Sequence, residues 1–320
     1  MSVVVLAGGT GGAKLAAGLQ AVVPPGELTV IVNTGDDTER HGLLVMPDHD
    51  SVLYMLSGRF DFERGWGVSG ESWSVMDALA GYGEDAWFRL GDRDFATHIA
   101  RHSRLSGGAS LTDAVRGLQA AVGIPSAILP MSDTPVRTQV RIDEGWLDFQ
   151  EYFVHRQQAP EVLEVRFVGV DGARPTREVL AALAGAGVVI IGPYNPIVSV
   201  GPIPALPGLR DALTEAHARG VPVAAVSPIV GGKALKGPAG RMLTSLGFES
   251  SALGVARQYA DLVDTFVLDQ QDADLVPAIE ALGVRAVAAD TIMRDDAGRA
   301  RVARSVLHAL ERNRGRWGPT

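Results

Sequence analysis

The sequence predicts a doubly wound α/β fold, in which helices cover both faces of a mostly parallel sheet. Short apolar runs of strand length recur along the chain, and segments of helix length separate them. That alternation is typical of parallel strands joined by crossover helices. With 320 residues, the chain is also long enough to bury a sizeable core.

Each predicted element is a run with one clear pattern. The strands are short, apolar and bounded by turn residues, and they are predicted at 3–7, 28–32, 126–130, 187–192, 221–226, 264–268 and 285–288. The helices fill the longer intervals between them, at 12–22, 50–57, 109–121, 176–185, 208–218, 251–260, 272–281 and 299–312. Together they predict a Rossmann-like sheet within a single α/β domain over residues 1–320.

Two regions depart from this rhythm. Polar and apolar residues alternate over 136–142 and again from Trp146 to Val154, with a turn at 143–145, which predicts an antiparallel hairpin addition within 136–170. Residues 58–108 carry Trp66, Trp73 and Trp87 but few strand signals. We expect this stretch to be a helical or irregular insertion on the acceptor side of a substrate site.

Composition excludes several classes of protein. Lysine plus arginine total 29 and aspartate plus glutamate total 37, so the net charge is 29 − 37 = −8, which argues against general nucleic-acid binding. The absence of cysteine excludes disulfides, thiolate metal sites and a cysteine nucleophile. No basic leader or membrane-length apolar run is evident. We therefore expect a soluble cytoplasmic protein without nucleic-acid or membrane partners.

A glycine-rich turn follows the first predicted strand. It consists of Gly8-Gly9-Thr10-Gly11-Gly12, and Lys14 comes shortly after it. A strand, a glycine turn and a helix in succession direct backbone N–H groups and a helix N-terminus towards a phosphate. The turn is neither a dinucleotide fingerprint nor a Walker A loop, because the spacing of both is broken. A tight turn without a ligand is the alternative, but we favour phosphate binding.

Four clustered carboxylates follow the second predicted strand. Asp36 and Asp37 come directly after it, and Asp48 and Asp50 precede the next helical run. Mg²⁺ prefers carboxylate and phosphate oxygens, so this cluster beside a phosphate loop predicts a magnesium site. Capping of a helix is the alternative for any single aspartate.

Polar groups also follow later strands. Two rigid loops rich in proline and glycine, 192–203 and 227–241, carry asparagine, serine and basic residues suited to a base and a diphosphate. In a further cluster, Asp92 or Asp94 is expected to cap a helix beginning near Phe95, with Arg93 reaching an anion. His98 and His102 share a helical face, but without a third ligand we do not expect them to bind a metal.

These residues, taken in order, resemble the 2-phospho-L-lactate transferase family, whose bacterial branch is described as phosphoenolpyruvate transferase. The resemblance covers about Val3 to Met293 and is carried by eight ordered motifs: Gly8–Gly11, Asn33–Asp37, Pro47–Asp50, Leu90–His98, Leu129–Asp133, Phe149–Glu151, Asn195–Ile203 and Ser227–Ile229.

The resemblance implies a reaction in coenzyme F420 biosynthesis. A phospholactyl or phosphoenolpyruvyl group would move from a guanosine diphosphate conjugate to the 5′-hydroxyl of the deazaflavin Fo, releasing GMP. The donor's small acid, whether lactate, enolpyruvate or glycerate, is left open. We also expect a homodimer. A nicotinamide-dependent oxidoreductase and a non-catalytic guanine-nucleotide-binding protein are the competing classes.

The resemblance also implies a role for each motif. The donor would be held by Gly8, Gly9, Thr10, Gly11, Gly12, Lys14, Asn195, Ser199 and Ser227. The metal would be held by Asp36, Asp37, Asp48 and Asp50. The acceptor would be bound by Asp50, Asp92, Arg93 and His98, with Asp50 and Arg93 catalytic. The basic segment from Arg299 to Arg316 is assigned no function.

Overall fold

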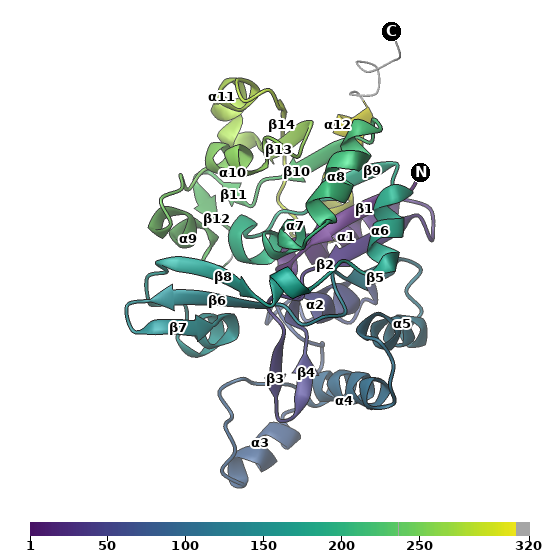
Figure 1. Cartoon of the computed structure of the whole chain (residues 1–320), viewed down its shortest axis with the longest axis vertical. Coiled ribbons are helices and arrows are strands. Elements are labelled where there is room, and N and C mark those ends of the chain that lie inside the picture. Colours follow the sequence, from purple (N-terminus) through teal and green to yellow (C-terminus); the bar gives the residue numbers. More distant parts are fainter. Residues whose placement is uncertain (236, 312–320) are drawn as a thin grey trace.

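A central parallel sheet organises the fold (Figure 1). The computed structural model describes residues 1–235 and 237–311, and within them seven strands lie in the order β14-β13-β10-β9-β1-β2-β5. Every neighbouring pair is parallel. The strands are β1 (Val3–Ala7), β2 (Leu28–Val32), β5 (Ala127–Pro130), β9 (Val188–Ile191), β10 (Val223–Val226), β13 (Thr265–Asp269) and β14 (Arg285–Ala289).

Helices cover both faces of this sheet, as predicted. Successive residues of β1 point to opposite faces, so Val3 and Val5 belong to one buried cluster and Val4 to the other. The first face is covered by α1 (Gly9–Val22), α2 (Pro47–Leu56), α5 (Leu111–Val122) and α12 (Asp296–Glu311). The second is covered by α6 (Arg177–Ala184), α8 (Leu209–Ala218), α10 (Ala252–Tyr259) and α11 (Val276–Glu280).

The helix predicted over 272–281 is divided in two. A 3₁₀ segment, Gln270–Leu275, precedes α11, and the backbone at Asp272 is not helical. Pro277 lies in the first turn of α11, where its fixed φ and missing N–H are tolerated but from which an α-helix cannot continue backwards. The end of the helix predicted over 299–312, and the basic tail to Arg316, lie outside the described residues.

The antiparallel addition has three strands, and its second strand is shorter than predicted. β6 (Arg137–Ile142) pairs with β7 (Gly145–Asp148) and with β8 (Glu164–Val168). The alternation from Trp146 to Val154 was misleading, because the chain after β7 forms the π-helical turn η1 (Glu151–His155). Phe149 and Tyr152 are both buried, and Phe149 stacks on Phe153 at 5.4 Å. That spacing of three and four residues suits a helical face.

The insertion at 58–108 contains two helices and irregular chain. They are α3 (Ser74–Gly81) and α4 (Asp92–Ser106), and α3 lies at the far end of the molecule in Figure 1. Smaller elements complete the fold: the hairpins β3 (Thr38–Arg40) with β4 (Leu43–Val45) and β11 (Ile229–Val230) with β12 (Lys233–Ala234), the helices α7 (Pro202–Ala205) and α9 (Ala239–Ser245), the π-helical turn η3 (Pro196–Val200) and the 3₁₀ turn at Val170–Gly172.

The glycine turn after β1 packs tightly against the chain that follows β9. Helix α1 begins at Gly9, whose φ of 55° lies in the left-handed region. A Cβ atom at Gly9 would overlap the ring of Tyr194, and one at Gly8 would overlap the backbone of Ser199. This turn therefore requires glycine for backbone conformation and for close packing.

We expect Gly9→Ala to lower the free energy of unfolding by about 2–3 kcal/mol, because it combines backbone strain with overpacking. Gly42→Ala is the matched control: its φ is 73°, but nothing lies within 4 Å of the added methyl group, so only about 1 kcal/mol should be lost. Urea denaturation would measure both. Equal losses would show that the Tyr194 contact adds nothing.

Candidate functional site

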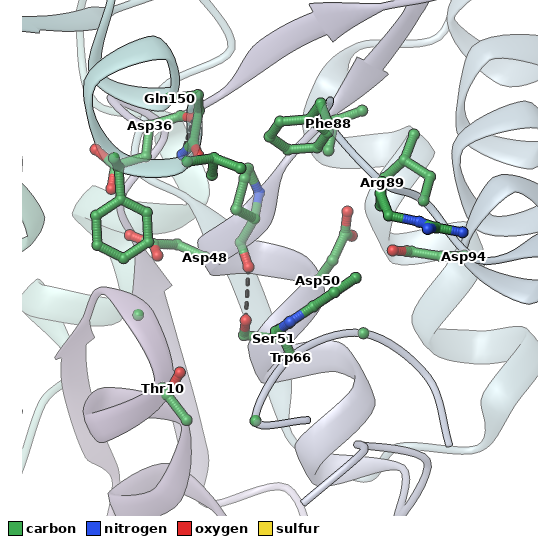
Figure 2. Close-up of a pocket in the computed structure, with 18 of the residues that line it drawn as sticks. Thr10, Asp36, Asp48, Asp50, Ser51, Trp66, Phe88, Arg89, Asp94 and Gln150 are labelled. Carbon is green, nitrogen blue, oxygen red and sulfur yellow. Dashed lines mark hydrogen bonds between the residues drawn. The ribbon is translucent and has the colours of Figure 1, made fainter. Parts of the chain in front are cut away.

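A cavity of about 450 Å³ lies at the carboxyl edge of the sheet (Figure 2). Three parts of the chain surround it. The glycine turn and the acidic segments supply Gly9, Thr10, Asp36, Asp48 and Asp50; the insertion supplies Trp66, Trp87, Phe88, Arg89, Asp94 and His98; the segment around η1 supplies Phe149, Gln150, Phe153 and Val154. In Figure 2, Asp36 and Asp48 lie at one end of the cavity and Asp94 lies at the other. Aromatic rings from the insertion and from η1 also line it.

Asp36 and Asp48 form the acidic end of this cavity. Burial and the nearby Asp48 carboxylate raise the pKa of Asp36 well above its ordinary value. Burial also raises the pKa of Asp48, to about 6, although Asn33 and the Gly9 backbone N–H donate to its carboxylate. Asp36 Oδ1 is buried and has no hydrogen-bond partner in the described chain. Burial thus raises the pKa of both acids, and no cationic side chain among the described residues forms an ion pair with either of them.

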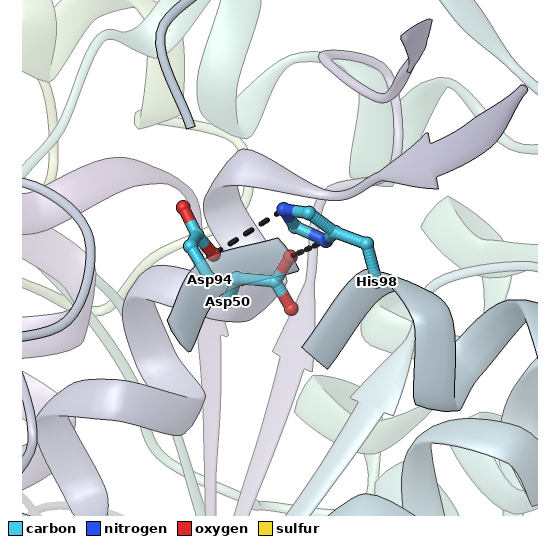
Figure 3. A group of neighbouring side chains, drawn as sticks. All are labelled: Asp50, Asp94 and His98. Atoms are coloured by element: carbon cyan, nitrogen blue, oxygen red, sulfur yellow. Dashed lines mark ion pairs between the residues drawn. The ribbon is translucent and has the colours of Figure 1, made fainter. Parts of the chain in front are cut away.

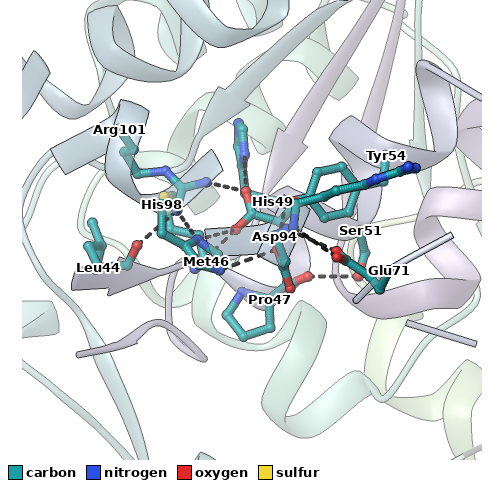
Figure 4. Close-up of polar contacts among 12 residues, drawn as sticks. Leu44, Met46, Pro47, His49, Ser51, Tyr54, Glu71, Asp94, His98 and Arg101 are labelled. Atoms are coloured by element: carbon teal, nitrogen blue, oxygen red, sulfur yellow. Dashed lines mark hydrogen bonds and ion pairs between the residues drawn. The ribbon is translucent and has the colours of Figure 1, made fainter. Parts of the chain in front are cut away.

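Asp50 belongs to a separate network of polar contacts. Figure 4 labels its partners Arg101, His98 and His49. Its carboxylate accepts a hydrogen bond from Arg101 on α4, and Arg101 is fully buried. Arg101 also donates to the Leu44 carbonyl at 2.9 Å. Burial alone would raise the pKa of Asp50, but the Arg101 guanidinium and the two neighbouring histidines hold it well below its ordinary value.

His98 links this network to a second acid (Figure 3). Its Nδ1 lies 3.6 Å from Asp50 Oδ2 and its Nε2 lies 3.3 Å from Asp94 Oδ1. Tyr54 donates to Asp94 at 2.6 Å. The side chains of Asp94, His98 and Arg101 share the buried face of α4, because they are spaced by three and four residues.

Two groups of side chains could hold a metal. Ligand atoms of Asp50, Asp94 and His98 lie within 4.8 Å of one another, so this triad satisfies the distances for a metal site. However, Arg101 already neutralises Asp50, and Tyr54 already donates to Asp94. Asp36 and Asp48 have no such cation among the described residues. The Asp36 oxygen without a hydrogen-bond partner is a ligand type that hard cations such as Mg²⁺ prefer.

The structure separates the predicted metal ligands. Asp36, Asp48 and Asp50 line the cavity, whereas Asp37 is buried and does not. Burial raises the pKa of Asp37, and Arg137 and Arg101 partly offset this. The four carboxylates that adjoin in sequence thus occupy three different environments.

Several predicted donor residues do not line the cavity. Gly9 and Thr10 do, but Gly8, Gly11 and Gly12 pack against neighbouring backbone or side chains. Lys14 is half-buried near Arg299 of α12, and burial with that positive charge lowers its pKa. Asn195 caps η3 by accepting from the Ile197 N–H at 3.0 Å.

The two serines are also buried within their loops. Ser227 donates to the Ile229 carbonyl at 2.9 Å and accepts from the Ile229 N–H. Ser199 is buried against Gly8, and its hydroxyl has no hydrogen-bond partner among the described residues. Neither serine side chain therefore lines the main cavity.

Asp92 and Arg93 lie outside the cavity. Asp92 accepts from the Ser74 and Val75 N–H groups, so it caps α3, and neither it nor Asp94 caps α4. Glu71 instead accepts from the first N–H groups of α4. Arg93 donates to the Ser69 carbonyl and lines a neighbouring cavity. Tyr54 lines both that cavity and the main one.

A second cavity, of about 640 Å³, lies on the other side of η1. Tyr152 lines it, whereas Phe153 and Val154 line the first cavity. Its polar lining includes Lys233, Arg241, Thr244, Ser245 and Ser250, together with Gly232, Gly237 and Gly240. Asn195 donates to the Met242 sulfur at 3.3 Å, and Met242 lines the second cavity. Consecutive residues of η1 therefore line two different cavities.

Sequence reasoning missed the residues that balance the acids. The sequence predicts no role for Arg101, Tyr54, Arg89, Gln150 or Tyr194. Arg101 donates to Asp50, and the other four line the main cavity. One signal was available for Arg101. A stripe of Asp94, His98 and Arg101 on one helical face is unusual unless those charges pair with one another or with a ligand.

Comparison with known proteins identifies the family. The doubly wound parallel sheet, with a cavity at its carboxyl edge, places the chain in the general class of α/β proteins that bind ligands at that edge. Residues 3–307 match the family described as 2-phospho-L-lactate transferase CofD. The chain belongs to this transferase family, as the sequence motifs predicted.

Relatives named phosphoenolpyruvate transferase and relatives named 2-phospho-L-lactate transferase reach the same sequence identity to this chain. A phosphoenolpyruvate transferase from Streptomyces griseus is 42% identical over 317 residues, covering 97% of this chain and 99% of the relative. A 2-phospho-L-lactate transferase from Methanosarcina acetivorans is 42% identical over 290 residues, covering 91% and 93%.

A solved structure shares the fold. A UPF0052-family protein from Bacillus halodurans superimposes with a TM-score of 0.64 at 16% identity, covering 96% of this chain and 100% of that one. None of the helices over the described residues has the length and apolar character needed to cross a membrane.

We expect Arg101→Met to lower the free energy of unfolding by about 3–5 kcal/mol, because Asp50 would be left buried without its counter-charge. Asp50→Asn added to this variant should restore part of the loss. Arg104→Met, on the same helix but partly exposed, is the control. Urea denaturation would measure the free energy of unfolding of each variant. If Arg101→Met loses no more than Arg104→Met, the proposed charge balance between Arg101 and Asp50 is contradicted.

Asp48 should make stability depend on pH. Because its pKa is about 6 in the folded protein and near 4 when unfolded, the folded state binds the proton more tightly. Stability is then lost as pH rises from about 4 to above 6. Asp48→Asn should therefore raise the free energy of unfolding by about 2 kcal/mol at pH 8 without divalent metal, and little at pH 4.

Chemical denaturation with a chelator present would measure this difference. Asp143→Asn, at an exposed turn, is the control and should change stability little at either pH. A variant at position 48 that is less stable than wild type at pH 8 would contradict the assignment.

Proposed function

We propose that this protein transfers a phospholactyl or phosphoenolpyruvyl group from a guanosine diphosphate conjugate to the 5′-hydroxyl of Fo, releasing GMP, in coenzyme F420 biosynthesis. The observation that carries the proposal is a single cavity with buried acids at one end and aromatic walls along its length. Family membership and the names of the relatives support the same reaction.

The acceptor is proposed to occupy the main cavity. Trp66, Phe88 and Phe153 would contact the planar deazaflavin, and its ribityl chain would extend towards Asp50. Asp50 is held ionised by Arg101, so it is suited to accept a hydrogen bond from the 5′-hydroxyl. A carboxylate with a depressed pKa is a weak base, so we assign Asp50 to orientation.

The donor nucleoside is proposed to occupy the second cavity. Its volume suits a nucleotide, and Lys233 and Arg241 supply positive charge in a protein whose net charge is −8. The distal phosphate would reach across η1 to Gly9 and Thr10. This placement replaces Asn195, Ser199 and Ser227 as donor contacts, because those side chains are buried within their loops.

Asp36 and Asp48 are the proposed holders of Mg²⁺, since their carboxylates line the cavity and lack a cation. When bound, Mg²⁺ would offset the negative charge of the diphosphate. The hydroxyl oxygen attacks the distal phosphorus, the bond from that phosphorus to the bridging oxygen breaks, and GMP leaves. The hydroxyl proton is lost to solvent or a carboxylate. Positioning by the two cavities dominates the chemistry.

Incubating the protein with the conjugate, Fo and Mg²⁺ tests the proposal directly. The phosphodiester product and GMP should appear together, as measured by mass spectrometry. GDP should also raise the melting temperature, whereas NAD at the same concentration should not, because a ligand of the folded state stabilises it. Stabilisation by NAD alone would favour a nicotinamide-dependent oxidoreductase, and GDP binding without turnover would favour a nucleotide-binding protein.

We propose Arg89, in place of Arg93, as the cationic contact to the acceptor. Arg89 lines the main cavity, whereas Arg93 does not. Arg89→Ala should reduce kcat/KM by about tenfold or more while GDP affinity stays unchanged, because one charge-assisted contact is lost. Arg93→Ala is the matched control. Steady-state kinetics would decide, and a larger effect at position 93 would reverse the assignment.

A further inference from the structure

The ring of Trp87 is stacked against the imidazole of His155. Their ring centroids lie 4.6 Å apart and the ring planes differ by 10°. Trp87 comes from the insertion, and His155 is the last residue of η1. Both elements line the main cavity, the insertion through Trp66 and Phe88 and η1 through Phe153. The stack therefore joins two walls of the cavity that are distant in sequence.

A cation holds the same tryptophan. The guanidinium carbon of Arg40, on β3, lies 4.3 Å from the Trp87 ring centroid and 5.3 Å from that of Phe88. Arg40 Nε is buried and has no hydrogen-bond partner in the described chain. A cation over an aromatic face is attracted by the ring's negative quadrupole. Arg40 thus anchors Trp87 on the insertion side.

The histidine has its own anchor on η1. His155 Nδ1 lies 2.8 Å from the Glu151 carboxylate, one turn earlier, and its side chain is 48% exposed. The contact between Trp87 and His155 is therefore accessible to solvent and lies between two braced side chains. Breaking it costs one ring stack and does not disturb the buried core.

We propose that the Trp87–His155 stack is a latch that closes the main cavity over its planar ligand, with His155 and Arg40 as positioning residues that hold Trp87. This proposal rests on the proposed function for the identity of the ligand, Fo. Entry or departure of the deazaflavin parts the stack, so the strength of the stack sets how long the acceptor stays bound.

His155→Ala should increase the dissociation rate of Fo by about threefold to tenfold, the range expected from losing one aromatic contact. GDP affinity should not change, because His155 does not line the second cavity. His155→Phe should restore slow dissociation, since a flat ring is retained without the Glu151 contact. His308→Ala, on an exposed face of α12, is the matched control. Stopped-flow detection of deazaflavin fluorescence would measure each rate.

Hydrogen exchange of the ligand-free protein provides a second readout. His155→Ala should accelerate exchange over residues 84–90, and His155→Phe should not. If exchange accelerates in His155→Ala but wild type does not bind Fo, the proposed function is wrong while the latch contact stands. If wild type binds Fo and His155→Ala releases it at the wild-type rate, the latch is wrong. Fast release by His155→Phe would also overturn it.

Discussion

The buried ion pair between Arg101 and Asp50 is the interaction on which the rest of the site depends. The Arg101 guanidinium is fully buried. Burial of this charge is offset because Asp50 carries the opposite charge and the Leu44 carbonyl accepts a further hydrogen bond. The pair connects α2 with α4, and so fixes the insertion to the edge of the central sheet. The wall that carries Trp66 and Phe88 is placed against the acids by this charge pairing.

That pairing also divides the acids into two kinds. Asp50 is held ionised by Arg101, whereas burial raises the pKa of Asp36 and Asp48, which have no cationic partner among the described residues. Four aspartates of one motif therefore differ in chemistry because their partners differ. A metal is recruited most readily where carboxylates are uncompensated, and a hydroxyl is oriented best by a carboxylate that stays ionised. The proposed division of labour follows from this asymmetry.

The η1 turn has a comparable organising role between the two cavities. Tyr152 lines one cavity and Phe153 and Val154 line the other, so three consecutive residues of η1 contribute to both cavities. A thin partition brings two ligands close while keeping their binding surfaces separate. The Trp87–His155 contact then connects this partition to the insertion. The η1 turn would therefore influence both proposed ligands. It carries His155 of the proposed latch over the acceptor, and Tyr152 at the proposed donor cavity.

The sequence by itself determined the parallel sheet, because the strands β1 and β2 are apolar runs followed at once by turn residues, and local pattern specifies such elements. It also predicted that the acids after the second strand lie at the carboxyl edge of the sheet, and Asp36, Asp48 and Asp50 line the main cavity there. Only the tertiary structure decided that Arg101 neutralises Asp50, that Arg93 points elsewhere and that Ser227 is buried. Those outcomes depend on which side chains meet across distant segments, and the periodicity of one segment carries no information about its partner.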